Sequence, residues 1–328
     1  IQSNPFELST SSGDSDWKLE NGELVKDVLA QNTAKMVMWS KERNKKDLNA
    51  YILSVLRLGL SFIVDLSSEF PNGMCTWFGE GWAFLKAKVY EHVNVEPKQF
   101  EGSTKELIDQ IDKLCCAYQY VYARNLLLDK MKDQSETTIN QQIIEIYLFI
   151  INMFLRDPCI FIDEDGQRKK LTELEYVMKV IAPILDIVFS DLKHLVELRW
   201  GETMSKVTSK SRKIDMRIVH RVRGIELSHT ECARFPTPVK AVRDRAKLLR
   251  TNKCILDHYL MEDPTLASTD ETVVFGLQFA GLNGQFIGVD LLDDGLYFGL
   301  EGPVFSFPIQ LSQIKKLRRT LEILYFFK

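Results

Sequence analysis

Apolar residues recur at helical spacing through most of the first half of the chain. After Asn21, which can cap a helix, they return every three or four positions and predict a helix over residues 23–41. Residues 105–132 and 137–155 show the same period, and the second segment is apolar on nearly every side, as in a buried helix. Residues 51–66 are apolar without a clear period, which fits either a helix or a buried strand.

The pattern changes after residue 157. The capping-box pair Thr172 and Glu175 begins a long predicted helix that runs to about Trp200 and is bent or interrupted at Pro183. From there on, the ordered segments are shorter and turn sequences separate them. This half of the chain therefore differs in kind from the helical first half.

Residues 213–220 and 224–228 are predicted strands, and residues 239–258 are a predicted basic helix. Residues 273–307 hold three strand-like segments separated by Asn-Gly and Asp-Gly turns, and residues 311–327 have the pattern of an amphipathic helix. This order predicts a mixed α/β fold, in which a helical N-terminal half precedes a mixed sheet flanked by helices.

Three parts of the chain follow from these patterns. Residues 1–16 are rich in Ser, Asn and Asp and are predicted to be a flexible lead-in. Residues 17–156 are predicted to form a mostly helical region, and residues 157–328 an α/β domain.

Composition narrows the class of protein. Apolar residues make up 45% of the 328 residues, as in a globular protein with a real core. The longest apolar run, residues 143–155, contains a glutamate and is shorter than the roughly 20 residues that cross a bilayer, so we expect no membrane span. The six cysteines show neither disulfide-framework nor zinc-ligand spacing, which favours an intracellular protein, cytoplasmic or nuclear.

Charge is unevenly distributed along the chain. Residues 201–253 hold 14 Lys and Arg against 5 Asp and Glu, whereas the net charge of the whole chain is −3. A local excess of cations suits a surface that contacts phosphates, because each neutralised phosphate releases counterions. An ordinary solvated face explains the same excess at this stage.

Acidic residues occur near the ends of the two strands predicted over residues 213–228. Asp215 lies in the first strand, and Glu231 follows 16 residues later, beyond the second. Glu226 lies within the second strand and competes with Glu231 for the same role. Carboxylates on adjacent strands can share a divalent cation, and Mg²⁺ takes one or two such ligands together with water and substrate phosphate.

This arrangement resembles the PD-(D/E)XK nuclease-like superfamily. Over roughly the last 150 residues the chain is also similar to an uncharacterised group of fungal proteins with the motifs R-[KR]-[IV]-D, E-L-S-x-x-E-x-K and K-x-x-R-x-N-K. The resemblance implies a restriction-endonuclease-like sheet, catalytic acids at Asp215 and Glu231 or Glu226, and bound Mg²⁺. It also implies that Glu202, taken as the end of the preceding helix, joins Asp215 and Glu231 as a metal ligand.

One residue departs from that pattern. The motif requires a lysine two positions after Glu231, and Ala233 occupies that position. Arg234 is one position further on and therefore on the opposite face of a regular strand, so it can replace the lysine only where a bulge redirects it. We therefore predict a degenerate nuclease-like protein that is inactive or weakly active.

Basic residues around the motif suggest how such a protein would bind nucleic acid. Arg243, Lys247 and Arg250 follow one another at i, i+4 and i+7, so they share one face of the predicted helix and can follow a phosphate backbone. The full set of candidate nucleic-acid-binding residues is Arg212, Lys213, Arg243, Lys247, Arg250 and Lys253.

Two other functions fit the same sequence. The first is an active Mg²⁺-dependent phosphodiesterase that cleaves DNA or RNA. The second is a helical module for protein–protein interaction, in which the acidic N-terminal half binds a basic partner.

Overall fold

The structure is a computed structural model. It describes residues 17–43, 48–133, 137–163, 165–208, 212–235, 237–263 and 272–328. The predicted flexible lead-in at residues 1–16 lies outside the described residues.

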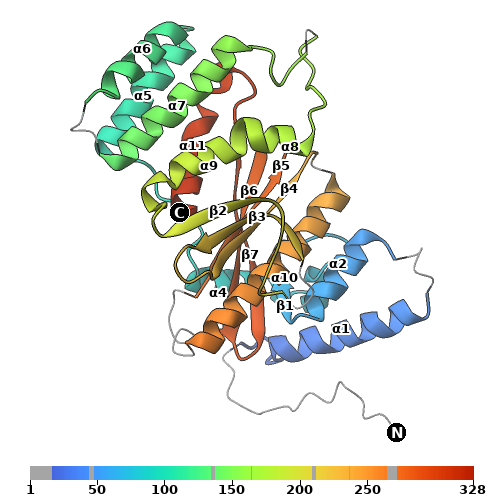
Figure 1. The fold of residues 1–328 in the computed structure, drawn as a ribbon. Helices are drawn as coiled ribbons and strands as arrows, with labels where there is room; N and C mark the ends of the chain where they lie inside the picture. Colours follow the sequence, from blue (N-terminus) through green and yellow to red (C-terminus); the bar gives the residue numbers. More distant parts are fainter. Residues whose placement is uncertain are drawn as a thin grey trace.

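Seven strands of the described chain form one mixed sheet in the order β1-β7-β6-β5-β4-β3-β2 (Figure 1). The strands are β1 (Ile63–Asp65), β2 (Val196–Met204), β3 (Lys213–His220), β4 (Glu226–Ala233), β5 (Val274–Ala280), β6 (Asn283–Asp293) and β7 (Leu296–Ser306). Helices flank this sheet, so the predicted mixed α/β fold is confirmed.

The first half of the chain is mainly helical, as predicted. Its helices are α1 (Val25–Lys41), α2 (Ala50–Gly59), α3 (Cys75–Phe78), α4 (Gly81–His92), α5 (Gly102–Cys116), α6 (Tyr120–Lys130) and α7 (Thr138–Arg156). The ambiguous segment 51–66 contains both α2 and the short strand β1. The predicted helix over residues 105–132 is two helices, because Tyr118 adopts a left-handed backbone with a φ of 59° between them.

Helices of the second half are α8 (Glu173–Tyr176), a π-helical turn (Val177–Ile181), α9 (Ala182–Val188), short 3₁₀ turns (Ser190–Leu192 and Leu311–Gln313), α10 (Pro238–Glu262) and α11 (Lys316–Phe327). The capping box is present, since Thr172 accepts from the backbone of Glu175 and the Glu175 side chain binds back to Thr172. The predicted basic helix and the three strands after it are confirmed.

The predicted helix up to Trp200 is wrong. The helix ends at Val188, and residues 196–204 form strand β2, which pairs antiparallel with β3. Val196, Leu198 and Trp200 pack partly buried against the core, which is the two-residue period of a strand. Glu202 therefore lies on a strand and not on a helix.

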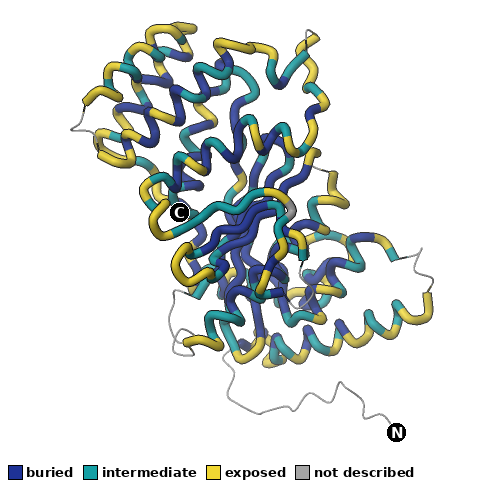
Figure 2. Tube along the Cα trace, in the orientation of Figure 1, coloured by how far each residue is buried: buried dark blue, intermediate teal, exposed yellow. Residues whose placement is uncertain are grey.

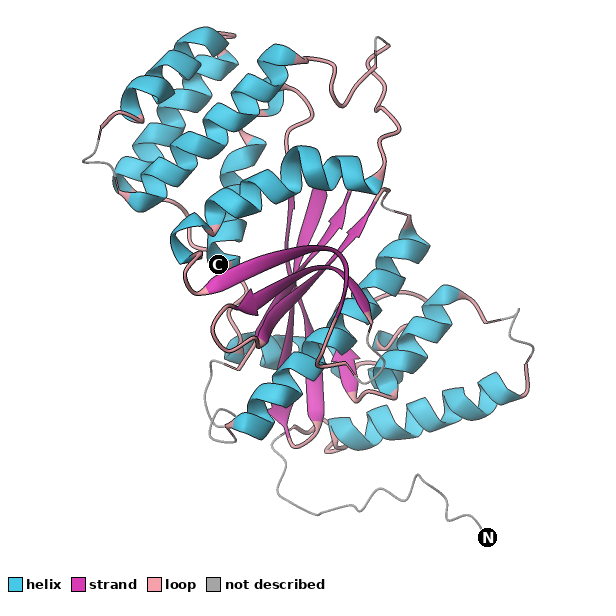
Figure 3. Ribbon diagram, viewed as in Figure 1, coloured by secondary structure: helices cyan, strands magenta, loops and turns pink. Residues whose placement is uncertain are grey.

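The two faces of the sheet are covered by different helices. Helix α10 packs against β4, β5 and β6 on one face. It comes so close that a Cβ at Gly276 of β5 would lie 2.5 Å from the amide nitrogen of Asn252. On the other face, Phe326 of α11 contacts the rings of Phe275 and Phe286, and Figure 3 shows the sheet held between the helices.

Groups of helices lie at opposite ends of the molecule, with α5, α6 and α7 at one end and α1 with α2 at the other (Figure 1). In the described residues, α7 is the one helix long and apolar enough to cross a membrane. Of its most apolar 18-residue stretch, 56% is buried inside the protein. Burial follows the strands and the inner helices, whereas the outer helices carry the exposed positions (Figure 2). Helix α7 is thus accounted for as a core helix.

Strand β1 connects the two halves of the chain. It lies beside β7 and runs parallel to it, with Val64 paired with Phe298. The sheet therefore includes residues from both sides of the boundary predicted at residue 157, while the division into two regions stays a prediction.

Candidate functional site

Strands β3 and β4 bring two of the predicted acids together. The strands are antiparallel, and Met216 pairs with Thr230. One residue further along this register, Asp215 stands opposite Glu231, and side chains directly opposite each other project from the same face. The backbone N–H of Cys232 donates to Oδ2 of Asp215 at 2.7 Å, which fixes the Asp215 carboxylate beside β4.

Glu231 is buried against α10 and makes one ion pair. Its side chain is 2% exposed, and Nζ of Lys247 lies 2.6 Å from its Oε2. Its other oxygen, Oε1, is buried and has no hydrogen-bond partner among the described residues. Burial raises the pKa of Glu231 to about 8, and the charge of Asp215 acts in the same direction, whereas Lys247 lowers it.

Helix α10 adds two further charged side chains near this pair. Nζ of Lys240 lies 3.0 Å from Oδ2 of Asp244. Burial raises the pKa of Asp244, and the Asp215 charge adds to the effect while Lys240 opposes it. We call Asp215, Glu231, Asp244, Lys240 and Lys247 the carboxylate–lysine cluster.

Sequence reasoning missed Lys240 and Asp244 and assigned Lys247 to phosphate binding only. The sequence does contain a feature that groups them. Lys240, Asp244 and Lys247 are spaced at i, i+4 and i+7 and so share one face of α10. What the spacing does not reveal is the strand residue that this face meets.

Glu226 lies on the same face of the sheet but in a different environment. Its carboxylate pairs with the guanidinium of Arg217, binds Nε2 of His229 at 2.7 Å, and accepts from Oγ of Ser205 at 2.7 Å and the backbone N–H of Lys206 at 2.9 Å. Burial opposes ionisation, but the bonds from His229, Lys206 and Ser205 outweigh it, so the pKa of Glu226 falls to about 2.

The two competing acids are therefore chemically different. The oxygens of Glu226 already bind four donors of the protein, so this carboxylate serves the fold. One oxygen of Glu231 has no donor, and its ionised form is disfavoured, as is common for acids at functional sites. Glu231 is thus the better partner for Asp215.

Arg234 does not reach the position of the motif lysine. It is exposed just beyond β4, where Nη2 donates to the carbonyl oxygen of Lys170 at 3.1 Å and the guanidinium lies over the ring of Phe235. The cation that contacts Glu231 comes instead from Lys247 of α10.

The predicted nucleic-acid-binding residues fall into separate places. Arg212, Arg250 and Lys253 line one pocket between α10 and the loops beside it. Lys247 pairs with Glu231, whereas Arg243 and Lys213 are exposed. Arg243, Lys247 and Arg250 do share one side of a continuous helix, as their spacing predicted.

The donor set of the cluster fits a magnesium ion only in part. Asp215 and Glu231 offer carboxylate oxygens, one of them unpartnered, and Mg²⁺ commonly completes its shell with water and substrate phosphate. In the described residues, no group of three His, Cys, Asp or Glu side chains is placed to hold a metal ion. The side chain of Glu202 lies outside the described part of the structure. Among the described residues, the two carboxylates of Asp215 and Glu231 suit a weakly held cation and not a closed cage.

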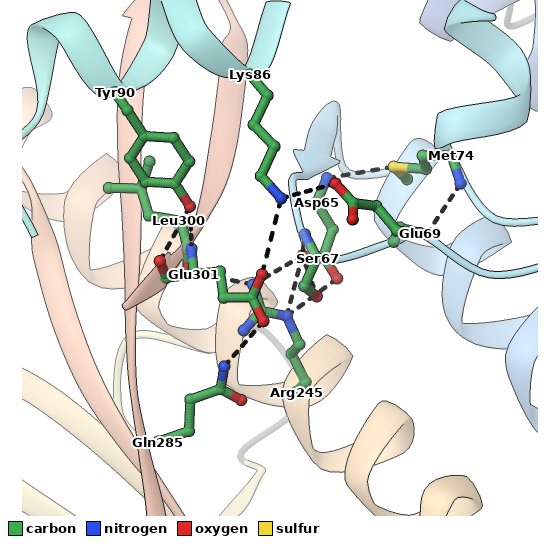
Figure 4. Close-up of polar contacts among 11 residues, drawn as sticks. Asp65, Ser67, Glu69, Met74, Lys86, Tyr90, Arg245, Gln285, Leu300 and Glu301 are labelled. Atoms are coloured by element: carbon green, nitrogen blue, oxygen red, sulfur yellow. Dashed lines mark hydrogen bonds and ion pairs between the residues drawn. The ribbon is translucent and has the colours of Figure 1, made fainter. Parts of the chain in front are cut away.

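A separate polar network joins β1, α4, β7 and α10 (Figure 4). Buried Arg245 donates to both oxygens of Asp65 at 2.8–3.2 Å and to the carbonyl oxygen of Leu300 at 3.1 Å. Nearby, Nζ of Lys86 lies 2.7 Å from Glu69. Arg245 directly follows Asp244 of the cluster on α10, so this network fixes the position of α10 relative to the sheet.

Comparisons with protein-family models, with curated proteins and with solved structures find no match for this chain.

Proposed function

We propose that this protein is a nuclease-like protein that binds nucleic acid along α10, with little or no cleavage activity of its own. The observation that carries the proposal is the contact of Lys247 with Glu231, directly beside Asp215. Two acids on adjacent strands with one cation are the groups that phosphodiester chemistry uses.

The order of elements around the cluster supports this proposal. The turn and helix at residues 173–188 precede the antiparallel strands β2, β3 and β4, and α10 then leads to β5, which is parallel to β4. A helix, antiparallel strands, a basic helix and a final strand are what the resemblance to PD-(D/E)XK nucleases implies.

The charges of α10 support nucleic acid as the ligand. Arg243, Lys247 and Arg250 are spaced to follow successive phosphates along one strand. Arg243 is exposed, and the described residues offer it no ion-pair partner. An intracellular location, cytoplasmic or nuclear, belongs to the same proposal and is supported by the six cysteines, which are all free.

Neutralising the basic side of α10 should weaken binding and reduce its salt dependence. We expect the variant Arg243→Gln, Lys247→Gln, Arg250→Gln to bind short DNA and RNA roughly a hundredfold more weakly than the wild type at low salt. The slope of log K against log salt should become shallower by about 2 to 3, because each lost phosphate contact removes about 0.7 to 0.9. Fluorescence anisotropy over a salt series measures both quantities.

A control variant removes the same charge elsewhere. Lys35, Lys41 and Lys98 are exposed and lie outside α10, and their replacement by glutamine should leave the affinity nearly unchanged. Equal losses in the two variants would show that the binding is unspecific. Absence of binding at low ionic strength would refute the proposal and favour the helical protein-interaction module.

A second candidate function is Mg²⁺-dependent cleavage of a phosphodiester. It is favoured by the position of Lys247, whose Nζ supplies at Glu231 the charge that the motif normally takes from the strand. Mg²⁺ held by Asp215 and Glu231 would supply Lewis-acid chemistry at the phosphate. Lys247 would stabilise the charge that develops there.

The test is incubation of plasmid and oligonucleotide substrates with Mg²⁺ or Mn²⁺. If the wild type cleaves them, both Asp215→Ala and Lys247→Ala should reduce cleavage to background, and Arg234→Ala should not. Cleavage that survives Asp215→Ala would show that these residues are not the site.

A further inference from the structure

A basic pocket of about 370 Å³ includes Arg250, which follows Lys247 of the carboxylate–lysine cluster by three residues on α10. It opens between the second half of α10, the connection from α2 to β1, the start of β7, and the two residues Thr208 and Arg212 before β3. Its polar lining consists of Ser61, Thr208, Arg212, Arg250 and Lys253. The proposed function does not by itself explain why these cations surround a hollow.

The charges at this pocket are not balanced. Arg250 is half-buried, and burial together with the neighbouring charges of Arg212 and Arg57 lowers its pKa to about 10. None of these three arginines pairs with a carboxylate among the residues that the structure describes. Lys253 differs, because Asp257 binds its Nζ at 2.6 Å. Arg212 and Arg250 thus line the pocket without a carboxylate partner, where a negatively charged ligand would relieve their repulsion.

The pocket wall is held in place by hydrogen bonds between its own residues and by the fold around it. Nε of Arg250 donates to Oγ of Ser61 at 3.3 Å, and the backbone N–H of Arg212 donates to Oγ1 of Thr208 at 3.0 Å. Phe62 adopts a left-handed backbone with a φ of 54°, which is costly for a bulky residue, and its carbonyl oxygen accepts from Tyr297. A strained wall maintained by its surroundings is typical of a ligand site.

We propose that this pocket binds the terminal phosphomonoester of a nucleic acid strand. A phosphomonoester carries close to two negative charges at neutral pH and three strong acceptor oxygens, which suits several arginines better than an internal phosphodiester does. The inference rests on the proposed function and specifies which part of the nucleic acid the protein recognises.

The pocket and the cluster lie close enough along α10 for one nucleic acid strand to contact both. Arg250 follows Lys247 by three residues on α10, and side chains at that spacing are neighbours, with Cβ atoms about 5–6 Å apart. A strand whose end occupies the pocket therefore has its first linkages close to Lys247 and Glu231. The protein would bind strand ends in preference to continuous duplex.

The experiment compares matched oligonucleotides that carry a 5′-phosphate, a 3′-phosphate or hydroxyls at both ends. We expect one of the phosphorylated forms to bind about tenfold more tightly than the hydroxyl form, since hydrogen bonds to charged groups are among the strongest. Inorganic phosphate should compete with the terminal phosphate for the pocket and so reduce this difference in affinity. The variants Arg212→Gln and Arg250→Gln should remove it, whereas Arg243→Gln, about two helical turns before Arg250 and outside the pocket lining, should keep it.

Equal binding of all three oligonucleotides would overturn the inference while leaving the proposed function intact. An advantage that persists in both Arg212→Gln and Arg250→Gln would also overturn it. Absence of any oligonucleotide binding would refute the proposed function together with this inference. Thermal unfolding of each variant, compared with the wild type, shows that the fold is retained.

Discussion

Replacement of Glu226 by glutamine should lower the free energy of unfolding by about 3–5 kcal/mol, because the change leaves a buried guanidinium without its counter-charge. Glu226 is 1% exposed and its partner Arg217 is 7% exposed, so water cannot take over the lost interaction. Glutamine also loses the charge that strengthens the bonds from Ser205 and His229.

The same carboxylate should give the protein an acid-sensitive stability. Its pKa is 4.5 in the unfolded chain and about 2 in the fold, so its contribution is complete above pH 4.5 and is lost as the pH falls toward 2. The wild type should therefore lose more stability between pH 5 and pH 2.5 than Glu226→Gln does. Chemical denaturation at a series of pH values measures both curves.

Glu197 provides the control for this prediction. It pairs with Arg199 on the same strand, β2, but both side chains are more than one third exposed. Glu197→Gln should cost less than about 1 kcal/mol, as is usual for surface pairs. A loss at Glu226→Gln no larger than at Glu197→Gln would contradict the role we give to the buried pair.

Glu231→Gln should have the opposite effect and stabilise the protein at alkaline pH. Burial raises the pKa of Glu231 from 4.5 to about 8, so the folded state disfavours the ionised form. The free energy of unfolding of the wild type should therefore fall as the pH rises from 4.5 through 8. Glutamine does not ionise, and at pH 9 the variant should be more stable by up to about 4 kcal/mol.

Denaturation at pH 5 and pH 9 tests this prediction. At pH 5 the two proteins should differ by less than about 1 kcal/mol, because the wild-type carboxyl is then protonated in the fold and resembles the amide. Lys247 is about one third exposed and can turn toward water in the variant. A variant that is less stable than the wild type at pH 9 would show that the Glu231–Lys247 pair holds the fold together.

Opposite results at Glu226 and Glu231 would distinguish a structural acid from a functional one. A buried carboxylate that costs stability is retained only where it does something else, since activity often requires a strained or destabilised site. Loss of nucleic-acid binding or cleavage in a stabilised Glu231→Gln would therefore strengthen the proposed function.

Local patterns in the sequence determined much of the fold. The capping box at Thr172 and the Asp294-Gly295 turn between β6 and β7 depend on residues a few positions apart, so they can be read without a structure. The turn between β5 and β6 is instead Gly281-Leu282, and the predicted turn residues Asn283 and Gly284 belong to β6. The spacing of Arg243, Lys247 and Arg250 likewise predicted a shared side of α10. The α/β fold class followed from the order of such elements.

Where a helix ends and a strand begins was decided by tertiary contacts. The segment after Pro183 was predicted to be helical, yet residues 196–204 pair with β3, and Val196 and Leu198 pack partly buried against the core. A strand at the edge of a sheet takes its conformation from the neighbour that it pairs with, and local propensity is a weak guide to that. The placement of Glu202 on a helix failed for the same reason.

The candidate site was determined only in part by the sequence. Asp215 and Glu231 could be identified by their motif, but Glu226 remained a competitor because its bonds to Arg217 of β3 and to Ser205 and Lys206 after β2 come from other segments of the chain. The cation at Glu231 comes from Lys247, 16 residues further along the chain, because α10 crosses back over β4. Helical spacing shows which side chains share a face, whereas only packing of that face against the sheet decides what each of them meets.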